Sequence, residues 1–177
     1  MSWSKKASHK HFQGKEGYAM KVVITDYIVP DITYEKEQCQ QMGADLLAYE
    51  LKSAEPQQLI PVVEDAEVIV VNMATISEAV INGMRQCKGI IRCGIGYDNV
   101  DVKAASKHGI KVINIPDYCL QEVAEQTVML IMACQRKLTQ QPMYLKRSVE
   151  AGRWVYDPIK PIYRISGKTV GDRKSVV

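Results

Sequence analysis

The chain has 177 residues, 46% of them hydrophobic, and a formal net charge of +3 at neutral pH. Residues 1–19 carry this whole excess of positive charge, so the remainder is neutral and a nucleic-acid-binding surface on the folded part is not expected. The five cysteines lack metal-ligand spacing and no stretch reaches the ~20 apolar residues of a membrane span, which favours a metal-free, cytoplasmic protein.

Residues 1–19 are polar and basic and show no periodicity, so we expect this extension to be disordered. Met20 is followed at once by an apolar, β-branched run and is a plausible true start of the protein. The extension is therefore left out of the fold prediction.

Strands and helices alternate from residue 21 onwards, which is typical of an α/β protein with a parallel sheet. Ser53 is expected to cap the second helix, and the third strand is apolar throughout, as a strand buried on both faces would be. The predicted strands are 21–25, 46–48 and 67–71. The predicted helices are 33–42, a second that begins after Ser53, takes Pro56 in its first turn and runs through 63, and a third at 77–84.

Flavodoxin-like proteins place their functional residues just after the first strand, so this segment tests two functions, flavin binding and phosphate acceptance. A flavin phosphate loop would need serines, threonines and glycines there, and residues 26–30 contain none of them. A phospho-acceptor domain would need adjacent acids and an aspartate at the end of the third strand, but only Asp26 is present and Asn72 ends that strand. Both functions are disfavoured. Asn72 itself is expected to form a turn by bonding its own backbone.

A strand–turn–helix–strand unit occupies residues 90–118. A short apolar strand leads into a glycine turn, Gly94-Ile95-Gly96, and Asp98 or Asp101 can cap the helix that follows. Gly109 is expected to end that helix before the next strand, residues 111–115. The glycine turn thus lies at the carboxyl end of a parallel strand, where open α/β sheets bind ligands.

The glycine turn also invites a dinucleotide interpretation, because Asp117 stands about 20 residues beyond it. The third glycine of that fingerprint is missing, since Asn99 occupies the region where the helix must approach the pyrophosphate closely. A tight strand-to-helix turn therefore remains the preferred interpretation.

The segment 120–138 is apolar on nearly all sides and predicts one long helix that several neighbours must cover. Residues 140–150 are expected to continue it. Trp154 follows in a short loop and is expected to anchor packing rather than to take part in catalysis.

Five ordered motifs, GIGYDNVD, PDYC, EVAE, AGRW and SGKTVG, resemble the D-isomer-specific 2-hydroxyacid dehydrogenase family. The similarity covers roughly residues 20–171. It is greatest to the branch that holds the C-terminal-binding proteins and phosphoglycerate-dehydrogenase-like enzymes.

The resemblance implies a flavodoxin-like substrate domain and an NAD-dependent oxidoreductase that acts on a small 2-hydroxy or 2-oxo acid. In such enzymes the N–H groups of Gly94, Ile95 and Gly96 would receive the substrate carboxylate. Asn72 and Met73 would form a second wall of the substrate cleft. The cofactor would contact Ile95 and Thr127. The helix at 120–138 would pair with a second subunit.

The family's nucleotide-binding strand and its glycine fingerprint should follow residue 171, but charged residues follow instead. We therefore expect a truncation before that motif. The resemblance places the catalytic arginine, acid and histidine beyond residue 177, so no catalytic residue of the family is assigned here, and no tight binding of NAD is expected.

The predicted organisation is an extension (1–19), a flavodoxin-like substrate domain (20–118), an interdomain helix with its tryptophan loop (119–164), and the start of a nucleotide-binding domain (165–177). The predicted function is that of a dehydrogenase substrate-domain fragment, inactive alone. The alternative is a non-catalytic dimerisation module that pairs with a full-length relative.

Deletion of residues 1–19 should change the thermal midpoint by no more than about 2 °C, because the extension has no apolar pattern with which to pack. Differential scanning calorimetry of the two chains measures the difference. A larger fall in the midpoint would show that the extension stabilises the folded part.

Overall fold

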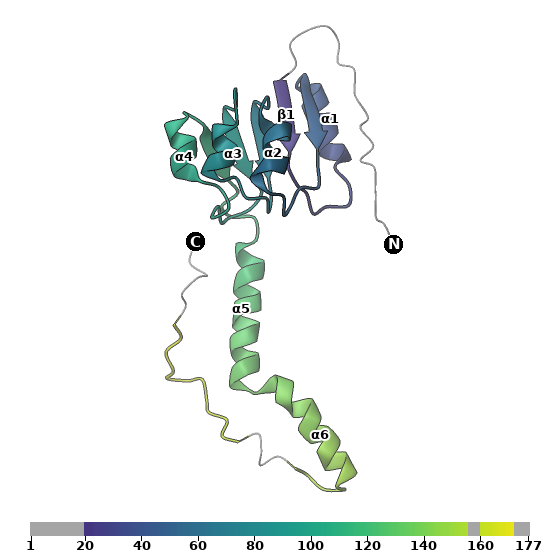
Figure 1. The fold of residues 1–177 in the computed structure, drawn as a ribbon. Coiled ribbons are helices and arrows are strands. Elements are labelled where there is room, and N and C mark those ends of the chain that lie inside the picture. The colour runs from purple at the N-terminus through teal and green to yellow at the C-terminus, as the bar shows by residue number, and fades with distance from the viewer. Residues whose placement is uncertain (1–19, 156–159, 172–177) are drawn as a thin grey trace. The chain divides into compact units, whose positions relative to one another are not determined.

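The computed structural model describes residues 20–155 and 160–171 (Figure 1). The predictions for the basic extension and for the charged residues 172–177 lie outside the described residues. The chain divides after Pro116 into two units.

The first unit contains a five-stranded, fully parallel sheet in the order β2-β1-β3-β4-β5. This order confirms the predicted flavodoxin-like arrangement of an α/β domain. The strands are β1 Met20–Ile24, β2 Ala44–Ala48, β3 Val68–Val71, β4 Gly89–Arg92 and β5 Lys111–Asn114. The helices are α1 Thr33–Gln41, α2 Pro56–Val63, α3 Glu78–Asn82 and α4 Val102–Lys107.

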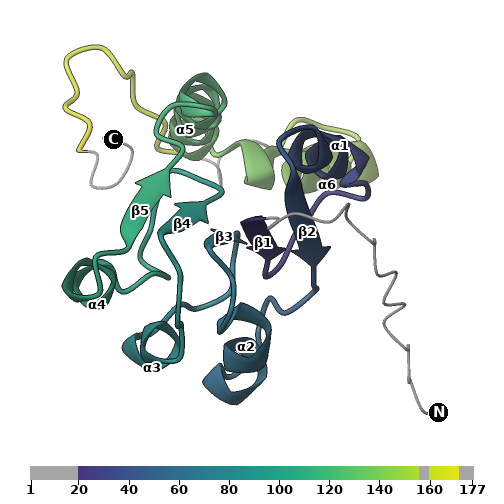
Figure 2. The same ribbon diagram turned by 90° about the horizontal axis from the view of Figure 1, so that it is seen from above.

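The core lies between the sheet and the helices α2, α3 and α4, which Figure 2 shows along one face while α1 lies on the other. One register row crosses all five strands on the core face: Leu47, Val23, Ile69, Ile90 and Val112. The three central members of this row are completely buried. Each helix adds small or branched apolar residues to the same layer, and this packing fixes the strand ends that carry the loops.

The other face of the sheet is less covered than the sequence predicted. β3 alternates between buried and half-buried residues, so the expectation that it is buried on both faces is wrong. Val70, Ile91 and Ile113 form one register row on this face, and Ile113 is 53% exposed. One face of β3 is thus fully packed against the core, and its other face is only partly covered, although the strand is apolar throughout.

The ends of α2 and α4 show local capping chemistry, with one correction to the prediction. Asp101, one of two candidates, caps α4 by accepting a hydrogen bond from the Ala104 N–H at 2.9 Å. Gly109 follows the end of α4 with φ +70°, as predicted, because a residue without Cβ tolerates that conformation. Ser53 does not cap α2. Glu55 does so instead, in a reciprocal capping box with Gln58.

The second unit contains α5 Leu120–Gln135, the short 3-10 helix η1 Leu138–Gln140, and α6 Gln141–Glu150. The prediction of one continuous helix through residue 138 and on to 150 is wrong, because Lys137 adopts a left-handed conformation with φ 51°. Pro142 stands in the first turn of α6, where proline is tolerated, whereas it would break the interior of a longer helix.

No residue of α5 is buried in this unit. Its exposed large apolar side chains are Leu120, Val123, Val128, Met129, Leu130 and Met132. Trp154 is 76% exposed, so the expectation that it anchors packing is not met within this unit. Of the helices in residues 20–155 and 160–171, none combines the length and the apolar character needed to cross a bilayer.

Candidate functional site

Two loops at the carboxyl edge of the sheet form the candidate site. We call residues 72–75, which follow β3, the β3 loop, and residues 93–98, which follow β4, the glycine loop. Because β3 and β4 are adjacent and parallel, both loops leave the sheet at the same edge, which is where α/β domains bind ligands.

A buried carboxylate holds the β3 loop. Asp26 follows β1, is only 2% exposed, and accepts a hydrogen bond from the Thr25 hydroxyl at 2.9 Å. Its two oxygens also accept from three successive backbone N–H groups, those of Asn72 at 3.1 Å, Met73 at 2.6 Å and Ala74 at 3.2 Å. The loop is therefore folded around a side chain that belongs to a different strand.

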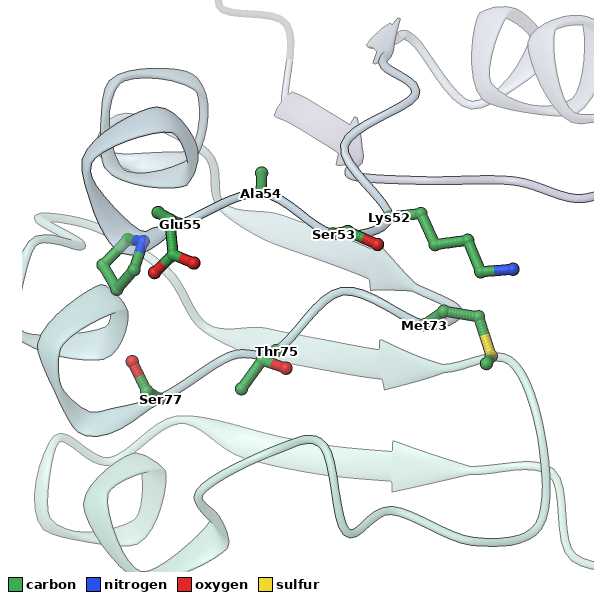
Figure 3. Close-up of a pocket in the computed structure, with 8 residues that line it drawn as sticks. Lys52, Ser53, Ala54, Glu55, Met73, Thr75 and Ser77 are labelled. Atoms are coloured by element: carbon green, nitrogen blue, oxygen red, sulfur yellow. The ribbon is translucent and has the colours of Figure 1, made fainter.

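Fixing the backbone in this way leaves the side chain of Met73 turned outwards and 47% exposed. Met73 borders an open pocket of about 560 Å³ between the β3 segment and the loop before α2 (Figure 3). In Figure 3 the side chain of Lys52 lies at the same end of the pocket as Met73. The full lining is Lys52, Ser53, Ala54, Glu55, Pro56, Met73, Thr75 and Ser77.

The glycine loop is anchored to the end of β5. The N–H of Ile115 donates to the carbonyl of Gly94 at 3.1 Å, and the side-chain amide of Asn114 donates to the carbonyl of Ile95 at 2.8 Å. The N–H of Gly94 is also used, since it donates to the carbonyl of Arg92 at 2.8 Å.

The backbone N–H groups of the next two residues differ from that of Gly94 in their hydrogen bonding. Within the described part of the chain, the backbone N–H groups of Ile95 and Gly96 donate no hydrogen bond. Ile95 is half-buried and Gly96 is exposed, so this part of the turn lies at the surface of the first unit. Successive backbone N–H groups in a turn make a binding position for an anion, and a carboxylate fits such a pair.

Arg92 stabilises the loop from behind. Its guanidinium donates to the carbonyl of Cys93 at 3.0 Å and to the side-chain oxygen of Asn99 at 3.4 Å. A Cβ on Gly94 would fall 1.5 Å from the Nη1 atom of Arg92, so any other residue there would displace the guanidinium from its present position. Arg92 therefore packs against the loop, and its guanidinium is bonded to groups of the protein itself.

Asn99 joins the two loops. Its side-chain Nδ2 atom donates to the carbonyl of Asn72 at 3.3 Å and to that of Ala74 at 2.8 Å. The sequence identified this residue only as a missing glycine. The signal that could have found it is an amide side chain just beyond a glycine turn, where a neighbouring loop exposes its carbonyls.

The structure brings five of the predicted site residues to one edge: Asn72, Met73, Gly94, Ile95 and Gly96. Asn72 bonds Asp26 and Asn99 through its backbone N–H and carbonyl, and the expected bond from its side chain to its own backbone does not occur among the described residues. Thr127 lies in α5, in the other unit, where its hydroxyl donates to the carbonyl of Val123 at 2.7 Å.

A dinucleotide site does not fit the residues described. The glycine loop leads to Asn99 instead of a third glycine, and the amide of Asn99 is bonded to the β3 loop. Residues 166–171 contain a turn but no strand.

Neither an activated thiol at Cys93 nor a cluster of metal ligands is found among the described residues. Burial raises the pKa of the Cys93 thiol above its usual value, against the opposing charge of Arg92, so the thiol stays protonated at neutral pH. Within residues 20–155 and 160–171, no three His, Cys, Asp or Glu side chains come together as a metal site.

Comparison with known proteins gives a consistent result. The family described as "D-isomer specific 2-hydroxyacid dehydrogenase, catalytic domain" matches residues 22–171. D-3-phosphoglycerate dehydrogenase of Methanocaldococcus jannaschii is 39% identical over 116 residues, which are 65% of this chain and 21% of that protein. Hydroxypyruvate reductase of Thermotoga maritima is 33% identical over 131 residues, 73% of this chain and 41% of that protein.

A solved structure with the same fold is NAD+-bound 3-phosphoglycerate dehydrogenase of Entamoeba histolytica, with a TM-score of 0.60 and 27% identity. The similarity covers 68% of this chain and 40% of that one. The matched region thus corresponds to between a fifth and two-fifths of the length of these relatives.

Asp26→Asn should destabilise the first unit by about 2–3 kcal/mol, because the new amide turns N–H donors towards buried N–H groups of the β3 loop. Urea unfolding followed by circular dichroism measures this loss. The control is Asp31→Asn, an exposed position where asparagine can still accept from the Thr33 N–H and where we expect no measurable change in stability. Equal effects of the two substitutions would contradict the role of Asp26.

Proposed function

Because the chain belongs to the D-isomer-specific 2-hydroxyacid dehydrogenase family, we propose that its first unit binds the substrate of an NAD-dependent oxidoreductase acting on small 2-hydroxy acids. The observation that carries this proposal is the pair of N–H groups at Ile95 and Gly96, which have no acceptor among the described residues. They are held in place by Asn114 and Ile115 on one side and by Arg92 on the other.

The proposed role of this site is to bind and orient the substrate. The carboxylate of a 2-hydroxy acid accepts hydrogen bonds from the two N–H groups, which orients its C2 atom relative to the β3 loop. Met73 supplies an apolar contact on the opposite wall, and its backbone is fixed by Asp26, so the two walls are formed before a ligand arrives. Neither contact depends on the protonation of a side chain that binds the ligand.

Oxidation of a 2-hydroxy acid removes a hydride from C2 and a proton from the hydroxyl group. NAD accepts the hydride in this family, and a base must accept the proton. The one histidine in the described part, His108, follows α4, away from the carboxyl edge of the sheet, and is paired with the Asn82 side chain at 2.9 Å. It is not placed to act as that base. We therefore propose that the purified 177-residue chain binds substrate without oxidising it.

Titration of the 15N-labelled chain with D-glycerate should shift the amide resonances of Ile95 and Gly96, whereas neutral D-glyceramide should not, because the site recognises the carboxylate charge. Gly94→Ala should abolish these shifts, since its Cβ would collide with Arg92. The same samples with NAD+ should form no NADH.

Two results would contradict this proposal. The absence of shifts at the glycine loop in the folded wild-type chain would remove the carboxylate site. Formation of NADH from a 2-hydroxy acid, after contaminating host dehydrogenases have been excluded, would show that a base and a cofactor site are present.

A second candidate function is a non-catalytic dimerisation module that pairs with another copy or with a full-length relative. The apolar surface of α5 favours it, because Leu130 is 50% and Val128 60% exposed within the second unit. Each large apolar side chain left in water forgoes roughly 1.5–3 kcal/mol of burial. Several adjacent ones form a patch that monomers rarely expose.

The double substitution Leu130→Glu with Ile131→Glu should shift the chain towards monomer in sedimentation velocity at tens of micromolar. Gln121→Glu with Gln126→Glu is the matched control, since it adds the same charge to exposed polar positions of α5. A wild-type chain that sediments as a monomer would contradict self-association through α5. Pairing with a full-length relative would then be tested by mixing the two.

A further inference from the structure

The two loops of the site form a closed ring of backbone. At its start, the N–H of Cys93 donates to the carbonyl of Val71 at 2.8 Å. At its end, the N–H of Ile76 donates to the carbonyl of Asn99 at 2.8 Å, and the N–H of Asp101 donates to the carbonyl of Ile76 at 2.9 Å. Between these closures, no described backbone hydrogen bond joins residues 72–75 to residues 94–98.

The side chain of Asn99 reaches into this opening from its far end. Its amide nitrogen holds the carbonyls of Asn72 and Ala74, the residues on either side of Met73. Its amide oxygen accepts from Arg92, which stands behind the glycine loop. A single half-buried side chain thus bonds the β3 loop directly and is linked to the glycine loop through Arg92, which donates to the carbonyl of Cys93.

We propose that Asn99 is a positioning residue that sets the spacing between the β3 loop and the glycine loop. This inference rests on the proposed function, in which the opening between the loops receives a 2-hydroxy acid. Asn99 does not touch the substrate. It acts through Met73 on one wall and through Arg92 and Gly94 on the other.

The contacts require an amide at this position. Two carbonyl oxygens must be met by a donor, and the guanidinium of Arg92 must be met by an acceptor. Among side chains of this size, only asparagine offers two N–H donors together with an acceptor, whereas a serine or threonine hydroxyl can donate only once. The substitution Asn99→Asp would present a carboxylate to the carbonyls of Asn72 and Ala74, which repels the β3 loop while keeping the pair with Arg92.

The β3 loop is consequently held along both edges of its backbone. Asp26 binds the N–H groups of residues 72–74, and Asn99 binds the carbonyls of residues 72 and 74. Asp26 fixes the conformation of the loop, whereas Asn99 fixes its position relative to the glycine loop. Removing Asn99 should therefore change the relation between the walls more than the fold of either one.

The test compares Asn99→Asp and Asn99→Ser with Asn114→Ser in the 177-residue chain. Asn114→Ser removes the 2.8 Å bond to the Ile95 carbonyl and so loosens the glycine loop alone. Backbone 15N relaxation dispersion, recorded without ligand, should show exchange at Met73 and Ile95 together in both Asn99 variants. In Asn114→Ser the exchange should be confined to the glycine loop. Thermal unfolding of each variant reports whether the fold is intact.

Titration with D-glycerate provides the second measurement. Both Asn99 variants should weaken binding roughly five- to tenfold, the equivalent of one lost hydrogen bond. Exchange that appears throughout the domain, or a β3 loop that stays as rigid as in the wild type, would overturn the positioning role. If D-glycerate binds neither to the wild type nor to any of the three variants, the proposed function fails. The relaxation-dispersion data, which are recorded without ligand, still decide the role of Asn99.

Discussion

The buried carboxylate of Asp26 is the interaction on which the site depends. A charged group that is 2% exposed is stable only when its oxygens are fully used, and here they accept from one hydroxyl and three backbone N–H groups. Those N–H groups belong to a loop that no strand pairing would hold. The end of β1 therefore determines the shape of the segment after β3, and β1 can do so because the two strands are paired.

The fold was predictable because the residues at the helix ends agree with the alternation of strands and helices along the chain. Short apolar strands alternate with helices whose ends carry Asp101 and Gly109, and this pattern defines a parallel α/β sheet before any contact is known. The glycine turn was also found correctly at a strand's carboxyl end. The location of five of the predicted site residues at one edge follows from these two facts, since every parallel strand delivers its loop to the same edge.

The remaining features depend on contacts that have no local pattern. Asp26 looks like an ordinary residue after a strand, and its partners lie 46–48 positions away. Asn99 was judged by the glycine it replaces, whereas its role comes from carbonyls 25 and 27 positions away. The break at Lys137 is a different kind of error. Pro142 indicated that the helix could not continue through this segment, but the prediction gave more weight to the apolar composition of the segment than to the proline.

The two walls differ in what they can recognise. The glycine loop offers backbone N–H groups, which every residue type except proline supplies, so it suits the carboxylate that all 2-hydroxy acids share. The β3 loop offers a side chain, Met73, beside a pocket that also contains Lys52 and three hydroxyl groups. A shared recognition element made of backbone can stay constant while side chains on the other wall change. Under the proposed function, selectivity among 2-hydroxy acids would belong to the β3 wall, and the contacts that keep the two walls in register would contribute to that selectivity.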